Sequence, residues 1–239
     1  MASDCKNCPF FDEFWESLLG DERKEKALLK AYYSHSLDIS CFDKQLKLCS
    51  QTPNQICEIL IKVLLKYSTQ SIIELIAEDF IPFEITMADI PQFSDFEVCL
   101  KDVVDVSIRS GIDGISYDQM GFLLRTQPRN LVADRKYGEN QAKTAVALGL
   151  MRMDYRHKFW VTPLGTCFYH LSDSEKKALA PKLCLYTPLV QNYFVTGQNG
   201  KALDGWMSIL AKSTYTRRLP NVQKMNGIVK ESIEDVYGS

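Results

Sequence analysis

The order of apolar runs and turn signals between residues 95 and 171 constrains the fold of this chain more than any other feature. From Phe96 to Ile108 the apolar residues are spaced as in a mostly buried helix, which Gly111 is expected to end. Ser116 and Gln119 have the spacing of a capping box, in which each side chain bonds the other residue's backbone. They therefore predict a second, short helix directly after the first.

A third helix, a hairpin and a closing helix follow. The third helix is expected over residues 138–149 because glycines stand at both of its ends. Residues 150–153 and 159–162 are strand-like runs separated by a polar, charged segment, which predicts a β-hairpin. Thr162 and Pro163 start the closing helix as cap and first-turn proline. Three helices, a hairpin and a closing helix are the order of a winged helix-turn-helix.

The residues on either side complete a mainly α-helical chain. Before residue 92 the apolar spacing predicts four helices, expected over residues 10–19, 23–33, 52–65 and 68–77. The segment 80–93 contains two Ile-Pro pairs, which favour an extended connector and a domain boundary near residue 92. The predicted fold class is mainly α with a small β-hairpin. It comprises an acidic helical domain (1–92), the winged helix-turn-helix (93–195) and a small basic helical pair (196–239).

Composition excludes several classes of protein. With 46% hydrophobic and 24% charged residues, the chain is expected to form packed cores and not to be disordered. Its longest apolar runs are far shorter than the roughly 20 residues that span a bilayer, so no membrane segment is expected. The N-terminal residues lack the basic start and apolar core of a secretion signal. A cytoplasmic location is therefore expected.

Charge is divided unevenly along the chain. Residues 1–100 hold 17 acidic and 9 basic side chains (net −8), whereas residues 101–239 hold 13 acidic and 19 basic ones (net +6). A basic half is common in nucleic-acid-binding proteins because Lys and Arg release counterions from phosphates. A chance imbalance of solvated surface is the alternative. The acidic half is expected to dock a protein partner or a second copy of the chain.

The third helix carries side chains suited to reading DNA bases. The recognition helix of a helix-turn-helix lies in the major groove, with its N-terminal part against base edges. On the predicted helix four polar residues are expected to point outward: Asn140, Gln141, Lys143 and Thr144. Asn and Gln can pair with adenine, Lys with guanine, and Thr with a phosphate or a thymine methyl group. This pattern predicts binding to double-stranded DNA.

Positive charge surrounds this helix. Between residues 125 and 158 there are eight basic residues and three acidic ones, a balance of +5, and Arg135 and Lys136 directly precede the predicted helix. The expected hairpin tip adds further DNA-contacting side chains: Tyr155, Arg156, His157 and Lys158. There a wing would follow the phosphates or enter the minor groove. The alternative is a winged helix that docks protein only, which would not need this density of positive charge.

A second basic stretch follows at the C-terminus. A helix from Ala202 to Ala211 and another from about residue 213 could form a further helix-turn-helix pair that includes Arg217 and Arg218. The alternative is a solvated C-terminal helix that packs on the winged domain. Pro220 lies inside the apolar pattern and argues against one long helix.

Three segments resemble the paired winged-helix modules of bacterial restriction-modification and phage-defence proteins. They are the run from Tyr137 to Ala145 with Leu148-Gly149-Leu150, the run from Trp160 to Gly165, and the run from Thr214 to Leu219. The resemblance covers about residues 100–225. It implies recognition by Asn140, Gln141, Lys143 and Thr144, and backbone anchoring by Arg217 and Arg218. It also implies a role as the recognition component of such a system or as a transcriptional regulator. Some relatives have tryptophan in the last helix, where Met225 or Ile228 stands here, so the second module matches less closely.

Eight cysteines raise the question of a metal. Cys5 and Cys8 have the two-residue spacing of a zinc knuckle, and the other ligands would come from Cys41, Cys49 or His35. Because Cys41 and Cys49 are too far apart for the usual second pair, free thiols are favoured over a structural zinc.

Signs of catalytic chemistry are few. A nuclease would need carboxylates that hold Mg²⁺ and a lysine that orients water. Glu22-Arg23-Lys24 and Glu175-Lys176-Lys177 have the carboxylate-x-Lys order, but both belong to the charged faces of expected amphipathic helices. A binding protein is therefore favoured over an enzyme, and a restriction-type nuclease with a divergent metal site is the alternative.

Overall fold

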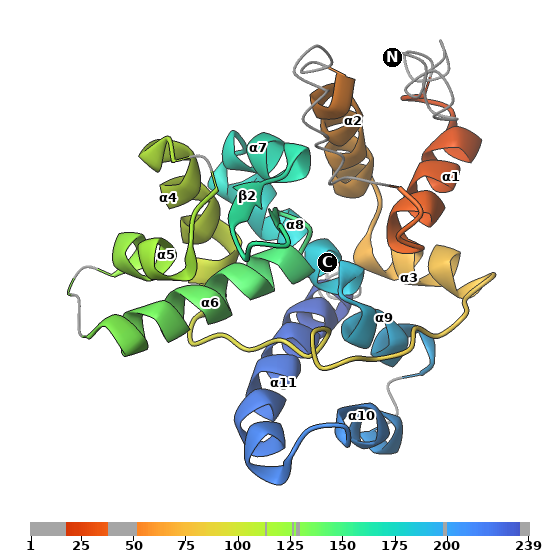
Figure 1. Ribbon diagram of the computed structural model, residues 1–239. Helices are drawn as coiled ribbons and strands as arrows, with labels where there is room; N and C mark the ends of the chain where they lie inside the picture. Colours follow the sequence, from red (N-terminus) through yellow and green to blue (C-terminus); the bar gives the residue numbers. More distant parts are fainter. Residues whose placement is uncertain are drawn as a thin grey trace.

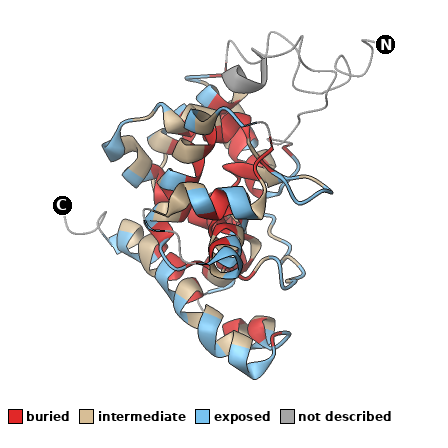
Figure 2. Cartoon of the chain, turned by 60° about the vertical axis from the view of Figure 1, so that its left-hand side comes forward, coloured by how far each residue is buried: buried red, intermediate tan, exposed pale blue. Residues whose placement is uncertain are grey.

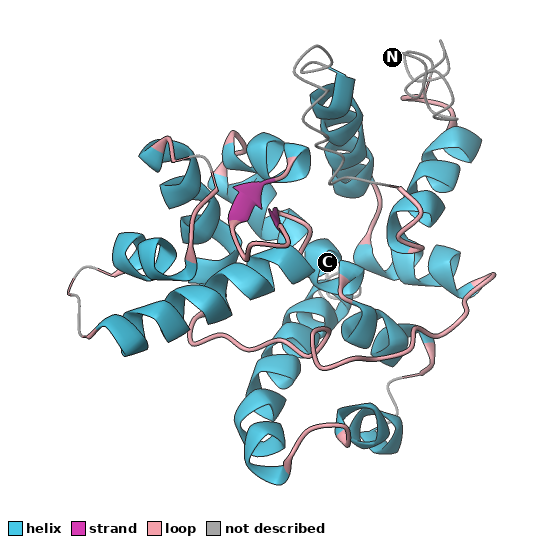
Figure 3. Ribbon diagram, viewed as in Figure 1, coloured by secondary structure: helices cyan, strands magenta, loops and turns pink. Residues whose placement is uncertain are grey.

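The computed structural model describes residues 18–37, 52–112, 114–125, 127, 130–197 and 200–234, with the backbone alone for residues 52–55. The described chain is mainly α-helical, and its strands form one two-stranded antiparallel hairpin (Figure 3). The predicted fold class is confirmed. None of the described helices is both long enough and apolar enough to cross a membrane.

The N-terminal helices begin close to where the sequence predicts. They are α1 (Glu22–Tyr33), α2 (Thr52–Lys66) and α3 (Thr69–Ala77). At the start of α1, the carboxylate of Asp21 accepts hydrogen bonds from the backbone N–H groups of Arg23 and Lys24. At the start of α3, the hydroxyl of Ser68 accepts a hydrogen bond from the backbone N–H of Ser71. These side chains satisfy donors that have no partner inside the helix. The helix expected over residues 10–19 lies almost wholly outside the described residues.

An irregular connector follows α3, as the two Ile-Pro pairs predict. Two helices from the far end of the chain hold it, α9 (Pro188–Val195) and α11 (Lys212–Glu234). The side chain of Asn192 in α9 accepts from the N–H of Phe83 and donates to its carbonyl, both at 2.9 Å. Arg218 of α11 donates to the carbonyls of Met87 and Ile90, both at 2.8 Å. The connector is therefore fixed by side chains more than 100 residues away.

The segment from η3 to α7 (residues 98–169), here called the winged unit, begins with helices that confirm two cap predictions. The single helix expected from Phe96 is a π-helical turn, η3 (Val98–Asp102), continued by α4 (Val103–Ser110). Gly111 ends α4 with a φ of +61°, in the left-handed region that glycine tolerates. Helix α5 (Tyr117–Leu124) opens with the predicted capping box between Ser116 and Gln119.

The boundaries predicted for the next helix are wrong. Helix α6 spans Leu131–Ala147, so it begins seven residues before the expected start at residue 138, with Asn130 as its N-cap. Gly138 lies inside the helix, where α5 approaches so closely that a Cβ atom would be 2.4 Å from the backbone N of Gly121 and the O of Tyr117. Glycine is present here because two backbones touch, not because the helix starts.

The hairpin forms as predicted from β1 (Met151–Met153) and β2 (Phe159–Val161), with Met151 opposite Val161. A segment that the sequence pattern did not indicate joins it. Ile115 and Phe159 exchange two backbone hydrogen bonds of 2.9 Å. The chain before α5 therefore adds an antiparallel bridge of one residue pair to β2. Thr162 caps α7 (Pro163–Tyr169), again as predicted. The order from α4 to α7 is that of a winged helix-turn-helix.

The remaining helices are α8 (Asp173–Tyr186) and α10 (Gly200–Met207), together with α9 and α11. The interpretation of Pro220 as an argument against one long helix is wrong, because α11 continues through it. Pro220 is exposed, so its ring faces solvent and its missing N–H removes only one bond of a 23-residue helix.

One core joins these parts. Buried side chains of α1, α2 and α3 belong to the same cluster as those of the winged unit, of α8 and of the last turns of α11. A smaller cluster joins α9, α10 and the first half of α11 with the connector at Ile90. Buried residues gather where the helices meet in the middle of the molecule, and exposed residues follow their outer sides (Figure 2).

Candidate nucleic-acid interface

Helices α5 and α6 lie side by side next to the hairpin (Figure 1). The loop between β1 and β2, here called the wing (residues 154–158), reaches Tyr117 at the start of α5. From α6, the guanidinium carbon of Arg135 lies 5.8 Å and Nζ of Lys143 5.6 Å from the centre of the Tyr117 ring. From the wing, the ring of His157 stacks on it at 5.9 Å. Tyr117 thus brings two cationic groups of α6 and the His157 ring of the wing onto one surface.

The exposed face of α6 carries an alternating set of charges. Lys136 and Lys143 are exposed, and Glu139 lies between them. The Lys136 amine is 2.9 Å from one carboxylate oxygen of Glu139, and the Lys143 amine is 2.7 Å from the other. Partial burial alone would raise the pKa of Glu139, but the hydrogen bonds from the two lysines outweigh it and lower the pKa. The two lysines therefore favour the charged form of Glu139.

The wing is held in one conformation by Asp154. Its carboxylate accepts the backbone N–H groups of Arg156 and Lys158, both at 2.9 Å, and the indole N–H of Trp160 at 3.3 Å. The backbone hydrogen bond from Lys158 is the main reason why the pKa of Asp154 is lowered. His157 has a φ of +59°, a conformation that few residues other than glycine adopt. The loop is thus a fixed tip.

All four predicted wing residues are exposed: Tyr155, Arg156, His157 and Lys158. The guanidinium carbon of Arg156 lies 5.1 Å from the centre of the Tyr155 ring, which is itself 83% exposed. The tip therefore offers cations and an aromatic face to solvent, a combination suited to phosphates and sugars.

Two residues predicted to read bases point inward, and this part of the prediction is wrong. Gln141 is fully buried, and its amide oxygen accepts from the N–H of Ser94 (3.3 Å) and the thiol of Cys99 (3.1 Å). Thr144 is 2% exposed, and its hydroxyl donates to the carbonyls of Gln92 and Asn140. Both side chains attach α6 to the connector and to η3, so neither can contact a ligand on the exposed face.

The other predicted residues of α6 are accessible. Arg135, Lys136 and Lys143 are exposed, and Asn140 is half-buried at the edge of their face. The buried face was recognisable from the sequence, because Gly138, Ala142 and Ala145 have the i, i+4, i+7 spacing of a close helix contact. Gln141 shares that face. The role of Tyr117 had no such signal, since only the tertiary contact of α5 with α6 and the wing brings the cations to it.

Fewer basic side chains face solvent here than the eight that the sequence holds between residues 125 and 158. Arg125 is bound to Asp134 at 3.2 Å and lies 4.5 Å from the centre of the Tyr137 ring, so it supports the α5–α6 contact. The side chain of Arg129 lies outside the described residues. Five cations remain on the exposed faces of α6 and the wing: Arg135, Lys136, Lys143, Arg156 and Lys158.

The two C-terminal arginines have different surroundings. Arg217 is exposed on α11, whereas Arg218 is half-buried and bonded to the connector as described above. Burial lowers the pKa of Arg218 from its ordinary value. Of the predicted anchoring pair, only Arg217 presents its charge to solvent.

Within the described residues no group of three or more His, Cys, Asp or Glu side chains is placed to hold a metal ion. The proposed zinc ligands Cys5, Cys8, Cys41 and Cys49 lie outside the described residues. Glu22 forms an ion pair with Lys26 on α1, and Glu175 closes the capping box of α8 with Ser172. These two carboxylates are thus engaged in helix structure.

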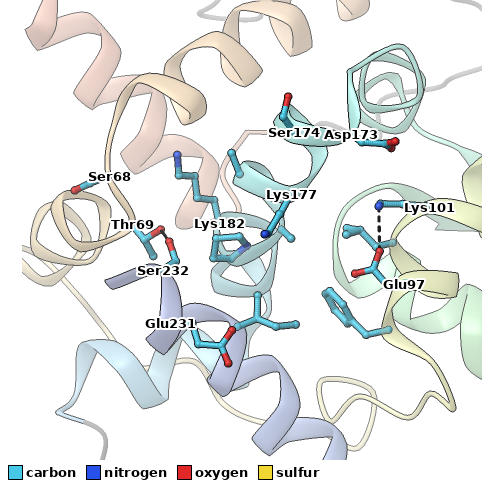
Figure 4. A pocket seen from close by; sticks show the side chains of 16 residues that line it. Ser68, Thr69, Glu97, Lys101, Asp173, Ser174, Lys177, Lys182, Glu231 and Ser232 are labelled. Atoms are coloured by element: carbon cyan, nitrogen blue, oxygen red, sulfur yellow. Dashed lines mark hydrogen bonds and ion pairs between the residues drawn. The ribbon is translucent and has the colours of Figure 1, made fainter. Parts of the chain in front are cut away.

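A surface cavity of about 780 Å³ lies between α3, η3, α8 and α11 (Figure 4). None of its lining residues belongs to α6 or to the wing. Lys101 is paired with Glu97 at 3.1 Å, and the hydroxyls of Thr69 and Ser232 are 2.5 Å apart. The lining holds three lysines and three carboxylates, so its charge favours neither an anion nor a cation.

Lys182, in the wall of this cavity, is a buried lysine with a structural role. Its side chain is 6% exposed, and its amine donates to the carbonyl of Leu64 in the last turn of α2. Carbonyls at a helix C-terminus have no partner inside the helix and attract cations. Burial lowers the pKa of Lys182 to about 8.

This pKa predicts a pH dependence of stability. Between pH 8 and the ordinary lysine pKa of about 10.4, the unfolded chain binds one proton more than the folded chain. The contribution of Lys182 to the free energy of unfolding should therefore rise with pH, by at most about 1.4 kcal/mol per pH unit.

Urea unfolding of the wild type and of Lys182→Met at pH 7, 8, 9 and 10 tests this. The difference between the two free energies should shift in favour of the wild type above pH 8. The comparison is needed because burial also raises the thiol pKa values of Cys57, Cys99 and Cys184, which destabilises both proteins at high pH. A difference that stays constant with pH would contradict the assignment.

Comparison of the chain with protein-family models, with curated proteins and with solved structures finds no match, so the geometry of α5, α6 and the wing carries the functional conclusion.

Proposed function

We propose that this protein binds double-stranded DNA through α6 and the wing. The observation that supports the proposal is the arrangement around Tyr117. There a helix-turn-helix places Arg135 and Lys143 beside a fixed loop that carries Arg156 and Lys158. The major groove, about 12 Å wide, admits one α-helix, and a wing next to that helix reaches the flanking phosphates or the minor groove.

The corrected burial pattern changes which side chains would contact bases. Because Gln141 and Thr144 are buried, the groups that face the groove are Arg135, Lys136, Glu139 and Lys143, with Asn140 at the edge. The wing cations would contact the backbone and position the helix, as phosphate contacts do in protein–DNA complexes generally. Such a protein would act as a transcriptional regulator or as the recognition component of a restriction or defence system, the two roles that the resemblance implies.

The test is an affinity titration on duplex DNA at several salt concentrations. Counterion release requires the logarithm of the association constant to fall by about 0.9 per logarithmic unit of salt for each phosphate neutralised. Five exposed cations on α6 and the wing set an upper slope of about 4 to 5. Affinity that is independent of salt, or the absence of binding at low salt, would contradict the proposal.

A second candidate is docking of a protein on the same unit. Three large apolar side chains are exposed at the end of the molecule where α5 leads into α6: Phe122 (66%), Leu131 (82%) and Val132 (79%). Apolar groups exposed in this way are typical of contact surfaces. If the unit binds protein only, replacing Lys143, Arg156 and Lys158 by alanine will leave the activity of the protein intact, whereas the DNA proposal requires its loss.

The acidic N-terminal half suggests a separate contact. Described residues up to 100 hold 11 acidic and 6 basic side chains, a net charge of −5, so this part repels a duplex. We propose that it contacts a protein partner or a second copy of the chain. Light scattering in solution distinguishes the two, because self-association doubles the mass of the purified protein.

A further inference from the structure

The exposed face of α6 carries three charged groups that are drawn together. Lys136 and Lys143 are seven residues apart, so their backbones are separated by about 10 Å along the helix. Their amines nevertheless bind the two oxygens of one carboxylate, that of Glu139, at 2.9 and 2.7 Å. This Lys136–Glu139–Lys143 triad therefore presents donor, acceptor and donor within a few ångströms, about the width of a base-pair edge.

A carboxylate at the centre of a DNA-facing surface needs an explanation, because it repels phosphates. A lysine amine has three N–H donors, so each lysine keeps two for a ligand after it has bonded Glu139. Lys143 is held further by Tyr117, whose ring centre lies 5.6 Å from its amine. The carboxylate thus fixes two long side chains that would otherwise lose rotamer freedom on binding.

The order of these groups matches one type of base pair. In the major groove an A·T pair presents an acceptor (N7), a donor (N6) and an acceptor (O4), followed by the thymine methyl group. A G·C pair presents two acceptors and then a donor. Donor, acceptor, donor is complementary to A·T and not to G·C. We propose, on the basis of the DNA binding proposed above, that the triad reads an A·T base pair in the major groove.

Val132, one turn before the triad, sets the orientation of the triad on the A·T base pair. Val132 is 79% exposed and precedes Lys136 by four residues, so it lies on the same face at the Lys136 end. The thymine methyl lies beside O4. Val132 therefore contacts the methyl group, Lys136 donates to O4, Glu139 accepts from N6 and Lys143 donates to N7.

The test compares duplexes of about two helical turns, ~20 base pairs, that differ in a central A·T or G·C block. Fluorescence anisotropy at one fixed salt concentration gives the ratio of the two affinities. For the wild type we expect a preference for A·T of about fivefold or more. Replacing adenine by 7-deazaadenine removes N7, and replacing thymine by uracil removes the methyl group. Each change should reduce the preference.

Two substitutions at one position separate reading from general electrostatics. Glu139→Ala removes the acceptor, so it should bind both duplexes with equal affinity, and the G·C duplex more tightly than the wild type does. Glu139→Gln removes the charge but keeps an amide that can pair with N6 and N7 of adenine, so it should retain the A·T preference. Circular dichroism of both variants checks that α6 is intact.

Each remaining outcome has a definite meaning. Salt-dependent binding of both duplexes with equal affinity, or an A·T preference that survives Glu139→Ala, overturns the triad while leaving duplex binding in place. If Arg156→Ala removes that surviving preference, the wing reads the narrow minor groove of A·T-rich DNA instead. If neither duplex binds at low salt, the proposed function itself fails.

Discussion

Replacing Gly138 of α6 by alanine is expected to destabilise the protein by about 2 kcal/mol and to weaken duplex binding. The added methyl group would lie 2.4 Å from backbone atoms of α5 at Gly121 and Tyr117, which no rotamer change can relieve. Overpacking of this kind costs about 3 kcal/mol, and the higher helix propensity of alanine offsets about 1 kcal/mol of that cost. Since α5 must move away from α6, Tyr117 no longer aligns Arg135 and Lys143.

Gly227→Ala in α11 is the matched control. It makes the same chemical change inside a helix, but apart from its chain neighbours and the adjacent backbone of α11 no atom lies within 4 Å of the added carbon. This variant should be more stable than the wild type by up to about 1 kcal/mol, and its affinity for duplex DNA should be unchanged. Urea unfolding followed by far-UV circular dichroism measures both variants. A Gly138→Ala protein as stable as the wild type would show that α5 and α6 are not in backbone contact.

The second large effect expected is a loss of affinity for duplex DNA when the basic residues of α6 and the wing are replaced. We expect the combined replacement of Arg135, Lys143, Arg156 and Lys158 by alanine to lower the affinity for duplex DNA by about three orders of magnitude at 0.1 M salt. If Arg135, Arg156 and Lys158 each neutralise one phosphate while Lys143 contacts a base, the slope of log K against log salt decreases by about 0.9 × 3 = 2.7. All four side chains are exposed, so the fold should be retained.

A control with the same change in charge uses α1 and α2, neither of which contributes a residue to α6 or the wing, and α1 lies on the opposite side of the molecule from α6 (Figure 1). It replaces four basic residues by alanine: Arg23, Lys24, Lys26 and Lys62. The net charge falls equally, so any effect of overall charge on affinity is reproduced, but the salt slope should stay within about one unit of the wild type. Equal losses for the two quadruple variants would mean that DNA association is non-specific and does not use the winged unit.

Local chemistry made much of the fold predictable. The capping box at Ser116, the cap at Thr162 and the left-handed end at Gly111 each depend on a few neighbouring residues. The same holds for the exposed wing, because charged residues between two short strands have no apolar surface to cover. These features form as the sequence predicts because their partners lie within four residues along the chain.

The errors lie where the partner is distant in sequence. The sequence pattern predicts a helix boundary at Gly138, but the residue lies inside α6 and contacts Gly121 of another helix. A polar side chain on a helix usually faces water, which predicts Gln141 at the surface, yet Ser94 and Cys99 donate hydrogen bonds to it in the interior. Pro220 predicts a break in the last helix, but α11 continues through it, as α8 does through the buried Pro181.

The amino-acid sequence alone thus determined where most helices begin, the position of the hairpin and the cationic character of the wing, because these follow from short-range hydrogen bonds and solvation. Only the tertiary structure decided that the polar side chains of Gln141 and Thr144 lie on the buried side of α6. That choice depends on the connector and η3 covering one face and on α5 touching the backbone of another. Packing between segments distant in the chain decides which polar side chains stay exposed, and the spacing of the small residues on α6 does not record that choice.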